Sequence, residues 1–577
     1  MDWKRIFLEP STPRHRQYEA LRAIAVDNIS IASVAKKFGY SIASLYSMIR
    51  DCKAGKCEFF PHIARGPKQR QTPLSIRQRV LDHRRENLSS ADIQFRLQQE
   101  GFTCSVRTVE RILADANIPK LSRRSFAQLG KTSKNAIISE RTGAIDFDTL
   151  KPFRYDCPVV GVFFFLPYLI ESGIINILKE CTLPKSSVIN SQHACLSMLL
   201  LKLVGGERLS HMNDYDHEPG LGVFAGLNFL PKATFMATYS CRSSEAMLTQ
   251  FQQQLMNVFQ KKYPDFYQSD FINLDFHSIP HYGEKSQMER LWVGAKHQVM
   301  KGANTLFAQD SQSNAILYTR ADILRKDETK EIQKFVNYWK TIKHRDVTET
   351  LVFDCKLTSY QVLDDLNREG IKFITLRKRS KNLITMTNQI EEKNWKHLYV
   401  PIPKRKNKSC KVYESHIILK KGFLPIRQII IKDHGRAEPT YIITNHLDLK
   451  MDQILIIYAK RWRIENKLAE LASFFNLNAL SSPLMIRIHF DILWTVIADT
   501  LYHRFAQDLP RFEHERADSL FRRFVNMPGQ VVYDGKEFII KIRKRAHTPI
   551  LLGVKRLQQP LIIPWLDHRT LRIEWTA

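Results

Sequence analysis

Residues 351–376 read LVFDCKLTSYQVLDDLNREGIKFITL, and their pattern indicates an α/β fold. Its first apolar run predicts a buried strand that ends at Asp354, a helix is expected to begin near Ser359, and Phe373–Leu376 predicts a second strand. This order of strand, helix and strand is typical of a parallel α/β arrangement. Sites in such sheets form at the carboxyl ends of the strands, where Asp354 is expected to lie.

A second acidic residue lies inside another apolar run. Residues 271–276 read FINLDF, which predicts a strand with Asp275 at its centre. A buried carboxylate is costly unless something neutralises it, so Asp275 is a better candidate for a functional acid than Asp270, which lies outside the run. Between the two acidic strands, Thr305–Asp310 and Ala315–Asp322 predict a β-hairpin.

A third acidic residue lies in the segment ILIIYAKRWRIEN, residues 454–466. Tyr458, Arg461 and Glu465 are spaced i, i+3 and i+7, which places them on one face of a helix. Trp462 has two interpretations. It is either a core residue or a platform on which a displaced DNA base stacks.

The spacing Tyr-x2-Arg-x3-Glu resembles the last catalytic motif of bacterial insertion-sequence DDE transposases. Three flanking stretches support the resemblance: VFD at 352–354, GIKFI at 370–374 and YIITN at 441–445. The resemblance covers about residues 190–505. It implies an α/β ribonuclease H-like core with a mixed sheet that carries Asp275, Asp354 and Glu465. It also implies a β-rich insertion between the second aspartate and the glutamate.

Cleavage of a DNA phosphodiester explains why such a site uses acids. Two Mg²⁺ ions about 4 Å apart activate the attacking oxygen, neutralise the phosphoryl oxygens and stabilise the leaving 3′-oxygen. Mg²⁺ prefers oxygen ligands, and Mn²⁺ is expected to substitute. We therefore expect Asp275 to bridge the ions and Asp354 and Glu465 to bind one each. Arg461 and Tyr458 are expected to position DNA phosphates.

One position departs from the family motif, which continues with a lysine where this chain has Ala472. Lys467 is two residues past Glu465, about 200° around a helix, and cannot simply replace that lysine. Another basic group, or none, then makes the phosphate contact. The departure keeps open an alternative function, a non-catalytic sequence-specific DNA-binding regulator derived from a transposase. A nuclease without joining activity is a third possibility.

The amino-terminal region predicts two α-helical DNA-binding units in tandem. Residues 1–58 and 74–125 each contain three short amphipathic segments of the helix-turn-helix pattern, with Gly39 at the turn of the first, and Ser90 and Ser105 as helix caps in the second. A small helical packing module is the alternative for either unit alone. The side chains expected to face the major groove are Ser44, Ser47, Arg50, Arg107, Thr108 and Arg111.

The remaining divisions follow from composition. The linker 59–73 contains Arg65, which would lie along phosphates or enter the minor groove, although an ordinary solvated linker is an equal alternative. The later segments are a linker (126–150), a helical pre-catalytic domain (151–265), the first part of the core (266–380), a β-rich insertion (381–437), the second part of the core (438–510) and a C-terminal region (511–577).

The overall composition indicates a nucleic-acid partner. The chain has 577 residues, 87 Lys and Arg against 58 Asp and Glu, and a net charge of +29. Double-stranded DNA, as element ends and target, and a homodimer in the DNA complex are the expected partners. Nine cysteines without metal-ligand spacing predict neither a zinc site nor a disulfide framework.

No membrane partner is expected, because the longest uncharged apolar run, Cys157–Ile170, is 14 residues long and a spanning helix needs about 18. This run predicts a buried helix that is kinked at Pro167. A cytoplasmic, nucleoid-associated location is the corresponding expectation.

Overall fold

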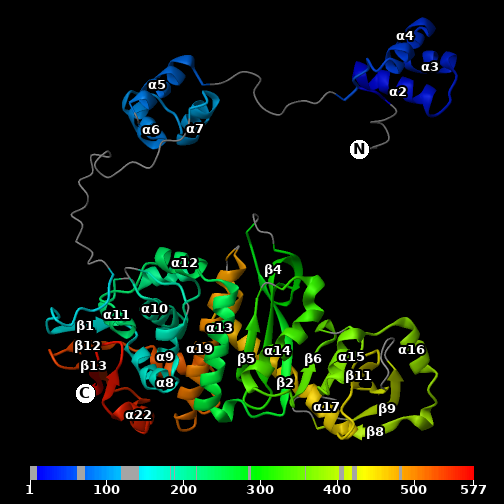
Figure 1. Cartoon of the computed structure of the whole chain (residues 1–577). Coiled ribbons are helices and arrows are strands. Elements are labelled where there is room, and N and C mark those ends of the chain that lie inside the picture. The colour runs from blue at the N-terminus through cyan, green and yellow to red at the C-terminus, as the bar shows by residue number, and fades with distance from the viewer. Residues whose placement is uncertain are drawn as a thin grey trace. The chain divides into compact units, whose positions relative to one another are not determined.

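The protein is described by a computed structural model (Figure 1). The described residues are 9–60, 72–86, 88–118, 142–181, 183–186, 189–215, 217–283, 288–321, 323–357, 359–401, 409–418, 425–479, 482 and 484–576. Arg65 lies outside them. The chain divides into two compact units, Met1–Ala136 and Ile137–Ala577.

The first unit begins with three helices that share a small apolar core. They are α2 (Pro13–Ala25), α3 (Ile31–Phe38) and α4 (Ile42–Lys53). Ala20, Val34 and Leu45 are fully buried between them. Gly39 ends α3 with a φ of 70°, which favours glycine, and the Ser41 hydroxyl caps α4. The predicted helices and turn are therefore present.

Three further helices of this unit form a second core. They are α5 (Leu74–Arg85), α6 (Ser90–Gln99) and α7 (Val106–Asp115). Ser105 caps α7 as expected, but the prediction that Ser90 caps α6 is wrong. Ser89 caps that helix, because its hydroxyl accepts from the Asp92 N–H while the Asp92 carboxylate accepts from the Ser89 N–H.

The second unit is built around a mixed ten-stranded sheet. Its strands are β2 (Phe271–Pro280), β3 (Arg290–Val293), β4 (Gln298–Asp310), β5 (Ile316–Arg320), β6 (Thr350–Phe353), β7 (Phe373–Leu376), β8 (Lys396–Tyr399), β9 (Ser409–Ile418), β10 (Pro425–Lys432) and β11 (Thr440–Thr444). The order is β3-β4-β2-β6-β7-β11-β10-β9-β8, and β5 also pairs with β4. Only the β2–β6 and β6–β7 pairs are parallel. The predicted strands and hairpin are confirmed, and the strands of the predicted insertion extend this same sheet.

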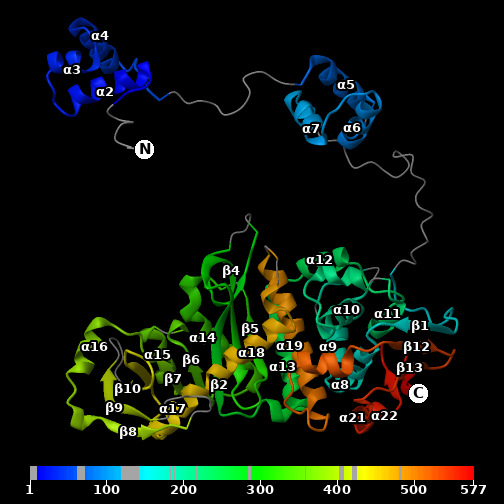
Figure 2. The same ribbon diagram turned by 180° about the vertical axis from the view of Figure 1, so that it is seen from behind.

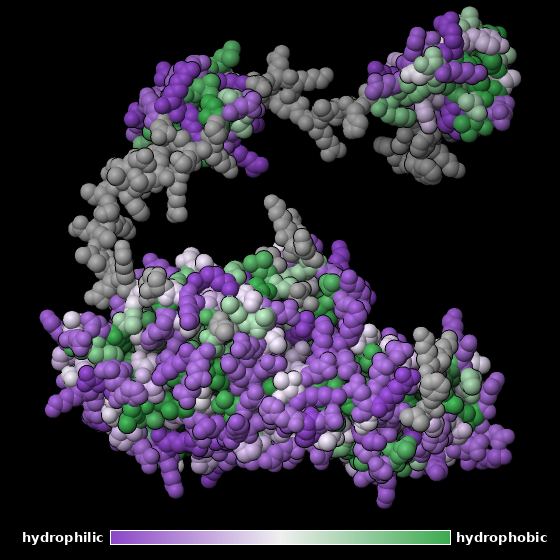
Figure 3. All heavy atoms as spheres, viewed as in Figure 1, coloured by the Kyte–Doolittle hydropathy of each residue, from purple (hydrophilic) through white to green (hydrophobic). Residues whose placement is uncertain are grey.

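Helices cover the sheet and continue into a helical region beside it (Figures 1 and 2). They are α8 (Leu166–Glu171), α9 (Ile174–Glu180), α10 (Ser191–Leu203), α11 (Pro219–Ala225), α12 (Ala233–Cys241), α13 (Glu245–Lys262), α14 (Glu331–Lys343), α15 (Tyr360–Arg368), α16 (Lys381–Asn388), α17 (Met451–Lys460), α18 (Trp462–Ser473), α19 (Met485–Gln507), α20 (Ala517–Leu520), α21 (Thr548–Leu552) and α22 (Lys555–Gln558). The face of this unit seen in Figure 3 is mainly hydrophilic, with small apolar patches.

The apolar run at 157–170 is buried as predicted, but it is not one kinked helix. A 3-10 helix over Val160–Phe165 precedes α8, and Pro167 lies in the first turn of α8, where its missing N–H costs nothing. Among the described residues no single helix has the length and apolar character to span a membrane. One pair of helical segments bent by 71°, Val160–Glu171 and Ile174–Glu180, meets those criteria jointly.

A five-stranded sheet joins the two ends of the second unit. It consists of β1 (Phe153–Cys157), β12 (Gly529–Tyr533), β13 (Phe538–Arg543), β14 (Leu561–Ile563) and β15 (Arg569–Thr576), in the order β1-β12-β13-β15-β14. Because β1 pairs with β12, the C-terminal region belongs to the same packed body as the helical region.

Candidate active site

Two of the three predicted acids lie side by side where the parallel strands β2 and β6 stop pairing. Strands β2 and β6 are parallel, and their last paired residues are Leu274 and Phe353. Asp275 and Asp354 directly follow these residues, on strands about 4.8 Å apart. The Asp275 carboxylate accepts from the Phe276 N–H at 3.0 Å. The Asp354 carboxylate accepts from the N–H of Cys355. The sheet topology therefore pairs the two acids.

Helix α18, which packs against β2, brings the third acid to the same place. Arg461 joins it to the first, because its Nη1 lies 3.1 Å from Asp275 Oδ2 and its Nη2 lies 2.8 Å from Glu465 Oε1. The side chains of Asp275 and Arg461 are 16% and 12% exposed, whereas Glu465 is 54% exposed. One buried guanidinium thus neutralises two acids of the predicted triad.

The prediction that Tyr458, Arg461 and Glu465 share one helix is wrong. Helix α17 ends at Lys460 and α18 begins at Trp462. At the break the Arg461 N–H donates to the Tyr458 carbonyl, an i to i−3 bond that tightens the turn. The side chains still converge, since the Arg461 guanidinium carbon lies 5.7 Å from the centre of the Tyr458 ring.

The charges at this site shift the pKa values of its members. Burial raises the pKa of Asp275 to about 6, Arg461 opposes that change, and the negative charges of Glu465 and Asp354 add to it. Burial also raises the pKa of the Tyr458 hydroxyl. Burial lowers the pKa of Arg461, but the surrounding acids outweigh burial and raise it overall. Asp354 therefore acts electrostatically on the same cluster as the other two acids.

The three carboxylates suit a hard divalent cation by their donor chemistry, because such ions take oxygen ligands. Within the described residues, however, no group of three or more His, Cys, Asp or Glu side chains is arranged to hold a metal ion. Arg461 occupies the space where Asp275 and Glu465 would share a ligand. A metal ion can bind all three acids only after Arg461 releases Asp275 and Glu465.

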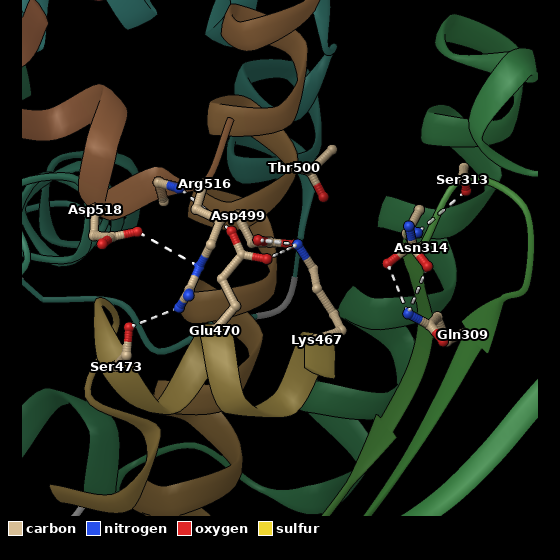
Figure 4. A network of polar contacts seen from close by, with 12 residues as sticks. Gln309, Ser313, Asn314, Lys467, Glu470, Ser473, Asp499, Thr500, Arg516 and Asp518 are labelled. Atoms are coloured by element: carbon tan, nitrogen blue, oxygen red, sulfur yellow. Dashed lines mark hydrogen bonds and ion pairs between the residues drawn. The ribbon is translucent and has the colours of Figure 1, made fainter. Parts of the chain in front are cut away.

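The opposite side of α18 carries a separate polar cavity of about 790 Å³, and none of the three acids lines it. Lys467 points into this region and pairs with Asp499 at 2.6 Å and Glu470 at 3.4 Å (Figure 4). As expected, Lys467 therefore does not take the place of the lysine in the family motif. Trp462 lines the same cavity and is 39% exposed, so the interpretation of Trp462 as a core residue is wrong. Ala472 packs partly buried against the core.

The sequence interpretation missed a basic group beside Asp354. Strand β7 lies next to β6 and runs parallel to it, and the run Arg377-Lys378-Arg379 follows its carboxyl end. The positive charge of Lys378 acts on the Cys355 thiol, next to Asp354. Lys378 is exposed and forms no ion pair within the described part of the chain. The signal for Lys378 in the sequence was its position shortly after the predicted strand Phe373–Leu376.

The predicted DNA-facing residues of the first unit lie mostly on open surface. Ser44, Ser47 and Arg50 are exposed on α4, with Ser44 Oγ 2.7 Å from Ser41 Oγ. On α7, Arg107 and Arg111 are exposed. Thr108 is half-buried, and its hydroxyl lies 2.9 Å from Ser105 Oγ. Their contacts with DNA stay predictions.

Comparison with known proteins adds one family match. Residues 295–500 match the family model described as Transposase DDE domain. That range contains Asp354 and Glu465 and begins after Asp275. No curated protein matches the chain. Among solved structures, a piggyBac transposase synaptic complex with hairpin DNA is 10% identical at a TM-score of 0.29, over 65% of this chain and 88% of that one. A TM-score this low establishes no common fold.

Proposed function

We propose that this protein is a DNA transposase that binds the terminal repeats of its element, cleaves DNA strands with a divalent metal and transfers the 3′-OH to a target. The observation that supports the proposal is the pairing of Asp275 and Glu465 with Arg461, beside the neighbouring strand that ends at Asp354, in a chain whose residues 295–500 match the Transposase DDE domain. The order β5-β4-β2-β6-β7, antiparallel then parallel, supports a ribonuclease H-like core.

In this function Asp275, Asp354 and Glu465 would hold two Mg²⁺ ions, or Mn²⁺. The ions would supply activation of the attacking oxygen and stabilisation of the leaving 3′-oxygen. Arg461, once it releases the acids, can donate both of its terminal nitrogens to one phosphate. The Tyr458 hydroxyl is protonated at neutral pH, as tyrosines ordinarily are, and burial raises its pKa further, so it can donate to another phosphate.

Two further assignments complete the proposal. Lys378 stands at the edge of the sheet that carries the acids, and we assign to it the phosphate contact that a lysine at the position of Ala472 would make. The three-helix units of the first unit would read the element ends through α4 and α7. A homodimer on DNA and a cytoplasmic, nucleoid-associated location belong to the same proposal.

The test uses linear DNA that carries the ends of the element from the protein's own genomic locus. The purified chain is expected to cut at the ends only with Mg²⁺ or Mn²⁺, and to join the 3′-OH to a plasmid target. Asp354→Asn and Glu465→Gln should lower cleavage by at least a thousandfold and keep end binding within about twofold. Asp448→Asn, which alters an acid that is 86% exposed and follows β11 away from the site, is the matched control. End binding without cleavage would instead support the regulator.

A further inference from the structure

Beyond Asp275, strand β3 (Arg290–Val293) and the start of β4 (Gln298–Lys301) form an antiparallel pair, which we call the β3–β4 arm. Strand β2 pairs with β4 as far as Pro280 and Gly302, and β4 then continues to pair with β3. Directly after β2, the His281 N–H donates to the Lys301 carbonyl at 2.9 Å, which extends the contact between β2 and β4 to the start of the β3–β4 pair. Figures 1 and 2 show β4 running up to the upper edge of this unit. The β3–β4 arm thus leads away from the candidate active site, beyond the end of β2, the strand that carries Asp275.

The surface of the arm exposes large apolar side chains. Trp292 and Val299 are directly opposite each other across the β3–β4 pair, and they are 57% and 51% exposed. Tyr282 is 61% exposed, and the Lys296 ammonium lies 5.8 Å from the centre of its ring. Exposed aromatic and aliphatic side chains at one tip indicate a binding surface.

The charge of the arm selects the partner. From Arg290 to Gln309 the sequence contains no Asp or Glu, whereas it contains Arg290, Lys296, His297 and Lys301. The Arg290 side chain donates to the Val299 carbonyl at 3.1 Å, which holds its guanidinium beside the exposed pair. The nearest described acid, Glu289, is half-buried and accepts from the Arg325 N–H at 2.8 Å. A mainly basic rim around an apolar centre is complementary to the sugars and phosphates of DNA.

We propose that the β3–β4 arm binds duplex DNA on one side of the cleavage point. In this arrangement Trp292 and Val299 lie against the sugars of the minor groove, and Arg290 and Lys296 contact the flanking phosphates. This inference rests on the proposed function for the position of the scissile phosphate.

The strand geometry sets the distance between the two contacts. Phe307 is the partner of Asp275, and Val299 lies eight residues farther along β4. At about 3.4 Å per residue the exposed pair is about 27 Å from the acids. At a rise of about 3.4 Å per base pair this corresponds to about eight base pairs. The arm therefore contacts DNA about six to ten base pairs from the cleavage point.

The experiment is a hydroxyl-radical footprint of the full-length protein on its end DNA without divalent metal, so that no cleavage is needed. Wild type should protect sugars about six to ten base pairs from the cleavage point. Trp292→Ala should expose those sugars alone and weaken binding about tenfold, whereas Trp292→Phe should restore most of the protection. Lys296→Ala should reduce the salt dependence of binding by about one counterion. Tyr399→Ala removes an equally exposed aromatic on β8 and should change neither result.

The outcomes separate the two proposals. An unchanged footprint of Trp292→Ala, with a wild type that cleaves, overturns the arm proposal alone. A protein that binds its ends and never cleaves overturns catalysis, while the footprint still decides the role of the arm. If Trp292→Ala changes only the oligomeric mass in light scattering, the arm contacts a second copy of the chain and the DNA proposal is wrong. Equal thermal melting of the variants establishes that each remains folded.

Discussion

Asp275→Asn should stabilise the metal-free protein while abolishing its activity. Burial raises the pKa of Asp275 from 3.8 to about 6, even with Arg461 beside it. The charged carboxylate therefore opposes folding by about 3 kcal/mol relative to its neutral form. Asparagine has nearly the same shape and carries no charge. At pH 7 the variant is expected to gain about that amount in free energy of unfolding, because the wild-type acid is ionised in both states.

The sign of the pH dependence follows from the same shift. A carboxyl group with a raised folded pKa contributes stability below its unfolded pKa, and that contribution is lost as the pH rises through about 6. The advantage of Asp275→Asn should therefore fall from about 3 kcal/mol at pH 7 to less than about 1 kcal/mol at pH 4. Asp270→Asn alters an exposed acid five residues earlier and is the matched control, with no change expected.

The assay is thermal melting in EDTA at several pH values, followed by the same series in Mg²⁺. In EDTA the melting temperature of Asp275→Asn should exceed that of wild type by an amount that grows with pH. In Mg²⁺ the wild type should gain stability and the variant should not, because only a charged site binds the ion. A lower melting temperature for the variant at pH 7 in EDTA would refute the reasoning, since the ion pair with Arg461 would then outweigh the cost of burial.

Four further predictions concern other parts of the chain. Lys378→Ala should slow cleavage about tenfold without changing end binding in gel shifts. Lys467→Ala should lower the free energy of unfolding by about 3–5 kcal/mol in denaturant unfolding, because it leaves Asp499 buried without its cation. Arg107→Ala should weaken specific end binding by about 1–3 kcal/mol in fluorescence titrations, and cleavage should recover at saturating DNA. Ser89→Ala should destabilise the helices around α6 by about 1 kcal/mol, measured by hydrogen exchange.

The features that the sequence predicted correctly are those encoded in short segments. Continuous apolar runs located the strands of Asp275 and Asp354, Gly39 located the turn before α4, and Ser105 located the start of α7. Spacing also indicated that the third acid would join them. Neighbouring positions were confused where two residues could cap one helix, as with Ser89 and Ser90, because only the bond to Asp92 distinguishes them.

Long-range pairings could not be read from the sequence. The partner of β1 lies more than 370 residues away in β12, and neither strand has a local pattern that identifies the other. For the same reason, the sequence did not show how the strands of the predicted insertion attach to the core. Its strands join the core because β11 pairs with β7, a contact that links Thr375 to Ile443 across the α16 and β8–β10 segment.

The break at Arg461 shows that the spacing identified the right residues although the single helix it predicted is two helices. Residues three and seven apart lie on one face only if the helix is continuous. Here the tighter turn at Arg461 separates α17 from α18. Arg461 pairs with Glu465 as an i, i+4 neighbour at the start of α18, and its other terminal nitrogen reaches Asp275 on β2. The break therefore places only Tyr458 on a different helix, while Arg461 and Glu465 keep their helical spacing. A shorter cation at position 461 would not span both contacts, which is why Arg461→Lys should behave like a loss of function rather than a conservative change.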